Sequence, residues 1–170
     1  MDLKTYVRDI QDWPKEGIVF KDITPLLGDG KSFKYAIDTI ADHYKGKKID
    51  AVLGAEARGF ILASALAYKL GCGFIPARKP GKLPYNTLSA EYELEYGVDS
   101  LEMHEDAIKP NEKILVVDDV IATGGTAAAK VELVERLGGE VAGIAFLIEL
   151  SFLNGRSKLG KHDIFSLITY

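Results

Sequence analysis

The segment that most constrains the fold of this chain runs from Ile114 to Thr126. It begins with four consecutive apolar residues, Ile-Leu-Val-Val, a run typical of a strand buried on both faces of a parallel sheet. Two carboxylates, Asp118 and Asp119, follow this run, and a Thr-Gly-Gly-Thr turn comes next. The segment 127–137 then has apolar residues at helical spacing and stops at a pair of glycines. The sequence therefore predicts a strand, an acidic pair, a glycine-rich loop and a helix, in that order.

The loop between this strand and this helix has the chemistry of a phosphate site. Its backbone amides, the positive end of the helix dipole and the hydroxyls of Thr123 and Thr126 all favour a phosphate group. The adjacent carboxylates would repel that phosphate unless they hold sugar hydroxyls or a divalent cation. The segment therefore predicts a ligand that carries a phosphate and a diol, with magnesium.

Two common phosphate-binding motifs do not fit this loop. A Walker-type loop has a lysine directly after its last glycine, and the dinucleotide fingerprint has the pattern G-x-G-x-x-G; the loop has neither. The segment resembles instead the ribose-phosphate motif of the type I phosphoribosyltransferases. The resemblance implies that Asp118 and Asp119 hold the ribose hydroxyls of phosphoribosyl pyrophosphate (PRPP), and that the loop binds its 5′-phosphate. The loop residues are Ala122, Thr123, Gly124, Gly125 and Thr126. A plain strand, turn and helix without a ligand is the alternative.

The length and composition of the chain limit the possible classes of protein. With 170 residues, the chain predicts a single domain, 1–170. Its net charge of -4 argues against a nucleic-acid-binding surface. The single cysteine, Cys72, has no internal disulfide partner, which fits a reducing compartment. Because neither a signal peptide nor a membrane-spanning apolar stretch is visible, we expect a cytoplasmic protein with no membrane or nucleic-acid partner.

The N-terminal segment, about residues 1–31, predicts a small lobe that we call the hood. Residues 2–10 have apolar side chains at helical spacing and predict a short helix, which a Trp-Pro pair interrupts. The segment 17–27, GIVFKDITPLL, fits a simple half-buried strand. It is also similar to the N-terminal hood of adenine phosphoribosyltransferases, where this segment binds the purine.

This resemblance implies where the base binds. Phe20 would stack on adenine, while Val19 and Lys21 would offer main-chain contacts. The family more often has arginine at the position of Lys21; backbone recognition survives that difference, whereas a guanidinium-specific contact does not. Leu150, just after a strand predicted over 140–148, would form the opposite face of the slot. Core packing is an equally good interpretation of this leucine.

A second loop with a charged residue follows a second predicted strand. The strand covers 49–53, a mostly buried helix covers 60–70, and Arg58 lies in the loop between them. Because the carboxyl ends of parallel strands meet at one edge of a sheet, Arg58 and the acidic pair should face one crevice. In the family the matching loop binds pyrophosphate, which implies that role for Arg58; a surface cation is the alternative. The family also has a strained, often cis, non-proline peptide just before this arginine, and the resemblance implies one within residues 56–58.

The sequence predicts a projecting hairpin over about residues 80–97. Such a hairpin in a compact domain is typical of a lid over a site, although a solvated charged hairpin is the alternative. The sequences RKPGKLP and LEYG resemble the flexible loop of adenine phosphoribosyltransferases. The cations that this resemblance assigns to pyrophosphate are Arg78, Lys79 and Lys82. It also places Glu95 near the purine imidazole nitrogen, where it would relay the N9 proton. His104 is given no role, because residues 102–105 predict an exposed strand edge.

Together these patterns predict an α/β protein with the type I phosphoribosyltransferase fold: a mostly parallel central sheet flanked by helices, with the hood and the hairpin lid. The resemblance implies transfer of the phosphoribosyl group from PRPP to adenine, which gives AMP and pyrophosphate. The catalytic residues would be Arg58, Glu95, Asp118 and Asp119. Mg²⁺ would be held mainly by PRPP and water, with no direct protein ligand, and the protein would be a homodimer.

Two alternatives to this function remain open. A hypoxanthine-guanine or xanthine enzyme usually recognises the 6-oxo group with a lysine late in the chain, and Lys158 and Lys161 are the late candidates. A regulator that senses PRPP without catalysis would carry an added DNA-binding domain and a basic surface. The hood sequence favours adenine over a 6-oxopurine substrate, and the net charge of -4 disfavours a DNA-binding regulator.

Overall fold

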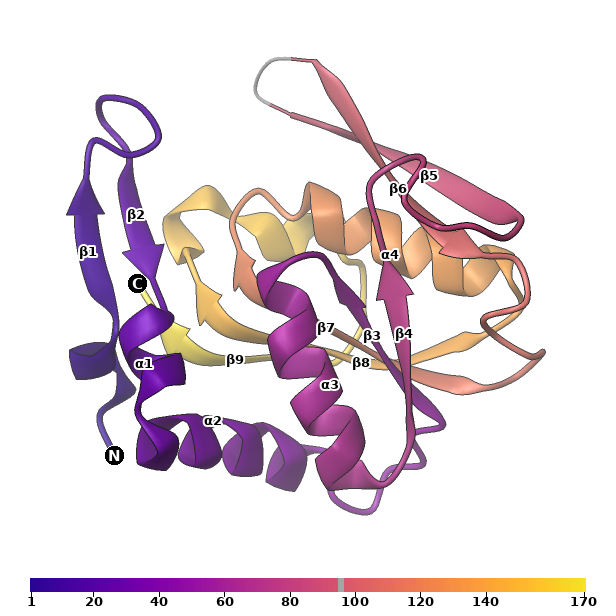
Figure 1. Ribbon diagram of the computed structural model, residues 1–170, viewed down its shortest axis with the longest axis horizontal. Coiled ribbons are helices and arrows are strands. Elements are labelled where there is room, and N and C mark those ends of the chain that lie inside the picture. Colours follow the sequence, from indigo (N-terminus) through magenta and orange to yellow (C-terminus); the bar gives the residue numbers. More distant parts are fainter. Residues whose placement is uncertain (95–96) are drawn as a thin grey trace.

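The centre of the molecule is a five-stranded parallel sheet with the order β4-β3-β7-β8-β9 (Figure 1). The computed structural model describes residues 1–94 and 97–170. The strands of the sheet are β3 (Ala51–Ala55), β4 (Gly73–Ala77), β7 (Lys113–Ile121), β8 (Glu140–Glu149) and β9 (Ile164–Thr169). The helices are α1 (Thr24–Gly28), α2 (Gly30–His43), α3 (Arg58–Leu70) and α4 (Gly125–Arg136). The prediction of a mostly parallel α/β sheet flanked by helices is confirmed.

Two apolar clusters lie on the two faces of this sheet. Successive side chains of a strand point to opposite faces, so Leu115 of β7 joins the cluster under α2 and α3, while Val116 joins the cluster under α4. Both residues are fully buried. This burial on both faces explains why the strand is a continuous apolar run with no alternation of polar residues.

The strand and the helix around the acidic pair form as predicted, with different bounds. β7 continues through Asp118 and Asp119 to Ile121, because its ladder with β8 continues on that side. α4 begins at Gly125, two residues earlier than predicted, with Gly124 as its N-cap. The acidic pair therefore lies inside the last part of the strand, in a fixed backbone conformation.

The hood is a hairpin, and the predicted helix over 2–10 is wrong. A short 3-10 helix, η1 (Leu3–Tyr6), is followed by β1 (Arg8–Gln11), which pairs antiparallel with β2 (Val19–Asp22). Ile10 lies opposite Phe20 in this ladder, so pairing between distant residues takes the place of local helical hydrogen bonds. The expected strand within 17–27 is confirmed as β2.

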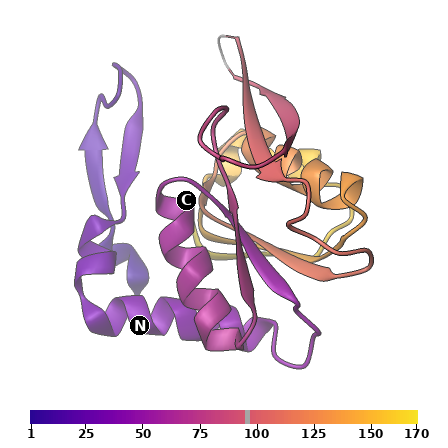
Figure 2. The same ribbon diagram turned by 45° about the vertical axis from the view of Figure 1, so that its right-hand side comes forward.

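A second hairpin, β5 (Thr87–Glu93) and β6 (Val98–His104), packs against α4. Figure 2 shows both hairpins extending beyond the same edge of the molecule. The prediction of an exposed strand edge at residues 102–105 is wrong for Met103, which is fully buried with Leu101 in the cluster under α4. The base of the predicted lid is thus anchored in the core.

Two short 3-10 helices, η2 (Ser151–Leu153) and η3 (Gly155–Lys158), connect β8 to the last strand. Within the described ranges 1–94 and 97–170, no helix has the length and apolar character needed to cross a membrane.

Candidate active site

A cleft of about 420 Å³ opens at the carboxyl ends of β3 and β7 and beside the hood. Ten of the predicted site residues line it. They are Val19, Phe20, Lys21, Arg58, Lys79, Asp118, Asp119, Ala122, Thr126 and Leu150. Thr123, Gly124 and Gly125 line an adjoining hollow, which shares Asp118, Ala122 and Thr126 with the cleft. Segments predicted to share one crevice therefore do so.

The phosphate loop has a backbone shape that requires glycine. Gly124 has a φ of +85°, in the left-handed region that other residues rarely adopt. A Cβ on Gly124 would lie 2.3 Å from the carbonyl oxygen of Gly155, in η3. The loop thus closes against η3, and the residues at the start of α4 line the adjoining hollow, where a helix N-terminus suits a phosphate.

Asp118 is fixed by contacts on several sides. Lys130 of α4 donates from Nζ to Asp118 Oδ2 and, at 3.1 Å, to the carbonyl oxygen of Val117. Asp118 Oδ1 accepts the backbone N–H of Asp119 at 3.0 Å. A Cβ on Gly59, in the first turn of α3, would lie 2.6 Å from the same Oδ1. The carboxylate therefore has little freedom to turn.

Sequence reasoning missed Lys130, which is fully buried. The helix was predicted from the apolar residues of 127–137 alone, but the buried side chains of α4 include Lys130 beside Leu133 and Val134. A signal was available, because Lys130 precedes two apolar residues by three and four positions and so lies on their face.

Asp119 is buried but less well paired than Asp118. Arg58 Nε lies 2.8 Å from Asp119 Oδ2, an ion-pair distance. The N–H direction falls outside hydrogen-bond geometry, so Oδ2 is a buried oxygen without a hydrogen-bond partner among the described residues. Burial, reinforced by the neighbouring Asp118 charge, raises the pKa of Asp119. An oxygen in this state suits a hydroxyl donor or a cation supplied by a ligand.

The three cations predicted for pyrophosphate pair with Glu56 and Asp99, and of these five residues only Lys79 and Glu56 line the cleft. Glu56, which lines the cleft, accepts from Arg78 Nε at 3.3 Å and from Lys82 Nζ at 2.6 Å. It also accepts the backbone N–H of Lys79 at 2.7 Å, while the ammonium of Lys79 pairs with Asp99. Burial acts to raise the pKa of Glu56, but the hydrogen bonds from Lys82, Lys79 and Arg78 outweigh it and lower the pKa to about 2.

Glu56 was not predicted as a site residue, although an unusual peptide bond was predicted next to it. The peptide between Glu56 and Ala57 is cis, as expected for residues 56–58. Nothing in the local sequence indicates that Glu56 collects cations, because its partners come from a segment 22 to 26 residues further along the chain.

The hood brings Phe20 to the cleft. Its ring meets that of Trp13 edge to face at 4.4 Å, and the guanidinium of Arg58 lies 4.8 Å from its centroid. The side chain of Lys21 pairs with Asp9, with Nζ 2.7 Å from Asp9 Oδ1. Leu150 donates its N–H to the carbonyl oxygen of Ile121 at 3.0 Å, which holds it beside the end of β7.

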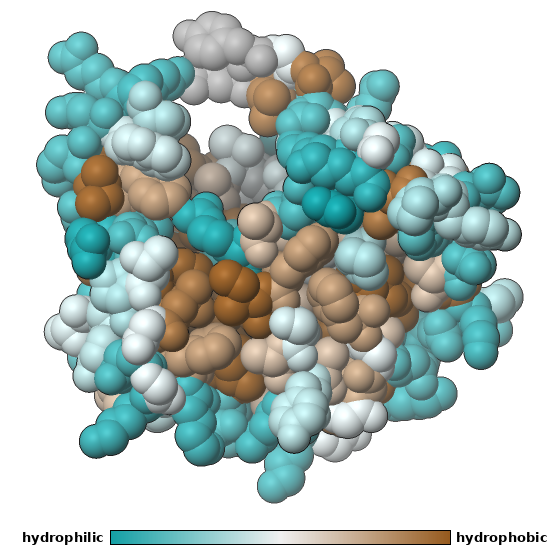
Figure 3. All heavy atoms as spheres, in the orientation of Figure 1, coloured by the Kyte–Doolittle hydropathy of each residue, from teal (hydrophilic) through white to brown (hydrophobic). Residues whose placement is uncertain are grey.

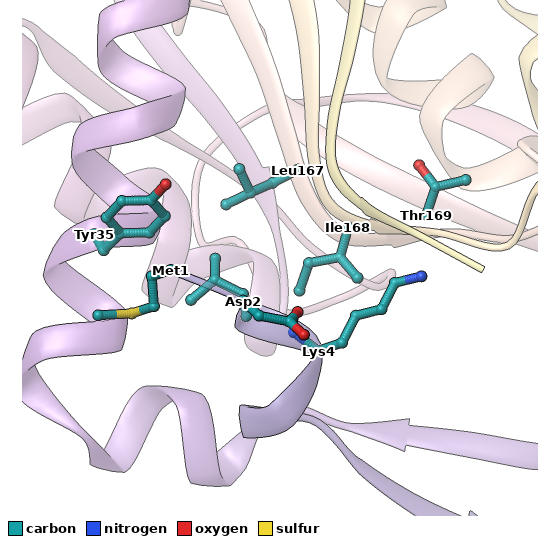
Figure 4. A pocket seen from close by; sticks show the side chains of 8 residues that line it. Met1, Asp2, Lys4, Tyr35, Leu167, Ile168 and Thr169 are labelled. Atoms are coloured by element: carbon teal, nitrogen blue, oxygen red, sulfur yellow. The ribbon is translucent and has the colours of Figure 1, made fainter.

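A separate pocket of about 370 Å³ lies between the N-terminal segment, α2 and β9 (Figure 4). Its labelled side chains include Asp2, Lys4, Tyr35 and Leu167, and it shares no lining residue with the cleft. The phosphate loop and the acidic pair both face the cleft, so the cleft is the candidate active site. Glu95, the predicted proton relay, lies outside the described residues.

The described residues include no group of three or more His, Cys, Asp or Glu side chains arranged to hold a metal ion. The oxygens available to a cation at the cleft are those of Asp118, Asp119 and Glu56. Oxygen ligands of this kind suit Mg²⁺, which keeps several of its own waters when it binds. The buried Oδ2 of Asp119, which has no hydrogen-bond partner among the described residues, fits a donor such as a ligand hydroxyl or a magnesium-bound water.

This combination of fold and cleft agrees with the comparison to known families. Residues 27–167 match the phosphoribosyl transferase domain, so the chain belongs to the phosphoribosyltransferase family. Two proteins similar to this chain belong to one branch of this family. The adenine phosphoribosyltransferase of Brachyspira hyodysenteriae is 60% identical over 170 residues, which is 100% of both chains. That of Thermotoga neapolitana is 58% identical over the same length, again 100% of both chains.

Solved structures similar to this chain are also adenine phosphoribosyltransferases. The crystal structure of the adenine phosphoribosyltransferase from Thermoanaerobacter pseudethanolicus is 55% identical, with a TM-score of 0.97 and coverage of 99% of this chain and 98% of that one. The Saccharomyces cerevisiae enzyme, complexed with an imino-altritol bisphosphate and adenine, is 42% identical, with a TM-score of 0.92 and coverage of 98% and 96%. Within its family, this chain therefore groups with the adenine phosphoribosyltransferases.

Proposed function

We propose that this chain transfers the 5-phosphoribosyl group of PRPP to adenine and releases AMP and pyrophosphate. The observation that carries the proposal is that one cleft and its adjoining hollow bring together a buried acidic pair, a glycine-rich loop, the cations Arg58 and Lys79, and the ring of Phe20. Each part suits a different portion of the two substrates. Relatives that are 58% to 60% identical along their whole length and bear the same enzyme name support it further.

The acidic pair holds the ribose in this proposal. The carboxylates of Asp118 and Asp119 accept the ribose hydroxyls, and their negative charge favours the positive charge that develops on the sugar as pyrophosphate leaves. The unpartnered Oδ2 of Asp119 supports this role, because a hydroxyl donor would satisfy it. The loop 122–126 binds the 5′-phosphate, which fixes the position of the sugar relative to the base.

The cations around Glu56 stabilise the leaving pyrophosphate. Arg78, Lys79 and Lys82 are held together by Glu56 and Asp99. Three cations drawn together in this way form a preorganised anion site, and pyrophosphate competes with the two carboxylates for them. Arg58 joins these three cations when it leaves its ion pair with Asp119 and binds the pyrophosphate. The Asp119 carboxylate is then free to bind the ribose.

Adenine binds between Phe20 and Leu150. Both residues line the cleft, and the ring of Phe20 offers a stacking surface once Arg58 has moved to the pyrophosphate. Main-chain groups of Val19 and Lys21 form hydrogen bonds with the edge of the base. The pairing of the Lys21 side chain with Asp9 supports this role for its main chain. Glu95 relays the N9 proton.

Asp118 and Asp119 lie where they could hold a Mg²⁺ brought by PRPP, which would itself supply most of the metal's ligands together with water. When bound, the metal supplies positive charge that neutralises the leaving group. Asp118 and Asp119 would contact its water shell. The single cysteine further supports work in a reducing cytoplasm.

The chain pairs with a second copy of itself through the face that carries α3 and the edge strand β4. Apolar side chains gather on this face (Figure 3), and Ile61, Tyr68 and Phe74 are 41%, 92% and 37% exposed. Light scattering should give twice the mass of one chain, and Tyr68→Glu should shift it toward one chain because it puts a charge in the interface. A monomeric wild-type protein would contradict the dimer.

The function is tested by measuring pyrophosphate release from PRPP with adenine, hypoxanthine, guanine and xanthine in parallel. We expect turnover with adenine to exceed the others by at least about 100-fold, because the site reads the base edge by hydrogen bonds. Lys158, a late lysine of the 6-oxopurine alternative, lines a different hollow beside α4, which disfavours that alternative. Equal or faster turnover with a 6-oxopurine would overturn the assignment of adenine.

A further inference from the structure

Lys130 is a buried charge that the reaction as described does not use. It is fully buried on the inner face of α4, and the oxygens it contacts are Asp118 Oδ2 and the carbonyl oxygen of Val117. Asp118 lines the cleft, and Val117 is the residue before it in β7. Among the described residues, Lys130 is the only lysine without an exposed surface.

Packing alone is a poor explanation for this lysine. A buried ammonium loses its hydration, and this cost is recovered only through a well-placed partner. An apolar side chain of similar length would fill the same space on the same face as Leu133 and Val134 without that cost. The ammonium is instead explained by its hydrogen bond to one oxygen of Asp118.

The two carboxylates of the pair therefore have different partners. The cation at Asp118 is Lys130, which is fully buried and also donates to the carbonyl oxygen of Val117. The cation at Asp119 is Arg58, whose side chain is 38% exposed and free to move to an incoming anion. Asp118 thus keeps one orientation through the catalytic cycle, while Asp119 exchanges its partner.

We propose that Lys130 is a positioning residue that fixes the Asp118 carboxylate for the ribose of PRPP. This inference rests on the proposed function. Lys130 holds Oδ2 and the Asp119 amide holds Oδ1, so the carboxylate is oriented before the substrate arrives. A carboxylate has about four acceptor sites, so it can still accept a ribose hydroxyl with both of these bonds in place.

Calorimetric titration of Lys130→Met with PRPP and, separately, with inorganic pyrophosphate tests this role. Methionine keeps the length of the side chain and removes the charge. The dissociation constant for PRPP should rise by about 10- to 100-fold, as for other partners that orient a ligand-binding side chain. That for pyrophosphate alone should stay within about twofold, because pyrophosphate does not contact Asp118. Lys34→Met, which removes an exposed lysine paired with Asp38 on α2, is the matched control.

The possible results separate the two proposals. Wild-type affinity for PRPP in Lys130→Met, or an equal loss for PRPP and pyrophosphate, would overturn the positioning role. A wild-type protein that fails to bind PRPP would overturn the proposed function instead. Thermal unfolding establishes that the variant is folded; if it is not, Lys130→Gln, which keeps a donor without the charge, is measured with the same expectations.

Discussion

The close approach of Gly59 to Asp118 allows the acidic pair to be displaced by a single methyl group. In Gly59→Ala, the new Cβ would lie 2.6 Å from Asp118 Oδ1, whereas ordinary contacts of a Cβ are 3.4–4 Å. The oxygen cannot simply swing aside, because Lys130 and the amide of Asp119 hold the carboxylate. Either Asp118 or the first turn of α3, which carries Arg58, must therefore shift by roughly 1 Å.

The size of the effect follows from this shift. A misplacement of about 1 Å in an active site costs on the order of 100-fold in rate, so kcat/KM for PRPP should fall by about that factor. Overpacking also costs about 1–3 kcal/mol of unfolding free energy. For a chain of this size, this lowers the Tm by roughly 2–12 °C. The variant should therefore be folded and nearly inactive at room temperature.

Steady-state kinetics with PRPP as the varied substrate, together with thermal unfolding, measure both effects. Gly30→Ala is the matched control, because a Cβ there meets no atom within 4 Å and Gly30 is the first residue of α2. It should retain full activity with an equal or slightly higher Tm. Wild-type kcat/KM for Gly59→Ala would refute the claim that a fixed Asp118 is needed.

Two other perturbations test the remaining parts of the cleft. Phe20→Ala should raise KM for adenine by about 5- to 150-fold, because stacking on an aromatic side chain contributes roughly 1–3 kcal/mol per base, and should leave KM for PRPP nearly unchanged; an unchanged KM for adenine would exclude Phe20 from the base slot. The lowered pKa of Glu56, about 2 in place of 4.5, means that its ion pairs stabilise the fold above pH 4.5 and lose that contribution as the pH falls toward 2. The difference in Tm between wild type and Glu56→Gln should therefore shrink from pH 6 to pH 2; a constant difference would argue against this pairing.

The sequence predicted the parts of the site that lie within one continuous segment. The apolar run 114–117 and the glycines after the acidic pair define β7, the phosphate loop and α4, because both signals are local. The hood was harder to predict. Leu3, Tyr6, Val7 and Ile10 also satisfy helical spacing, and only pairing with residues 8 to 14 positions further along the chain makes residues 8–11 extended.

The parts that sequence reasoning missed depend on contacts between distant segments. Glu56 gathers cations that come from the segment after β4, and no local pattern marks that meeting. Lys130 was overlooked for a different reason. A charged residue within a helix is normally assigned to the solvated face, and only the three-dimensional partner, Asp118, makes its burial possible.

The central claim is that the carboxylates at the end of β7 hold the ribose during transfer to adenine. Asp119→Asn tests it most directly, because Asp119 Oδ2 makes no hydrogen bond among the described residues and its replacement should leave the fold intact. We measure AMP formed from PRPP and adenine by chromatography, alongside the Tm. The wild-type protein should form AMP and pyrophosphate in equal amounts, and Asp119→Asn should be slower by about 100- to 1,000-fold at a similar Tm. Absence of AMP from the wild-type reaction, or near-normal turnover by a folded Asp119→Asn, would contradict the account.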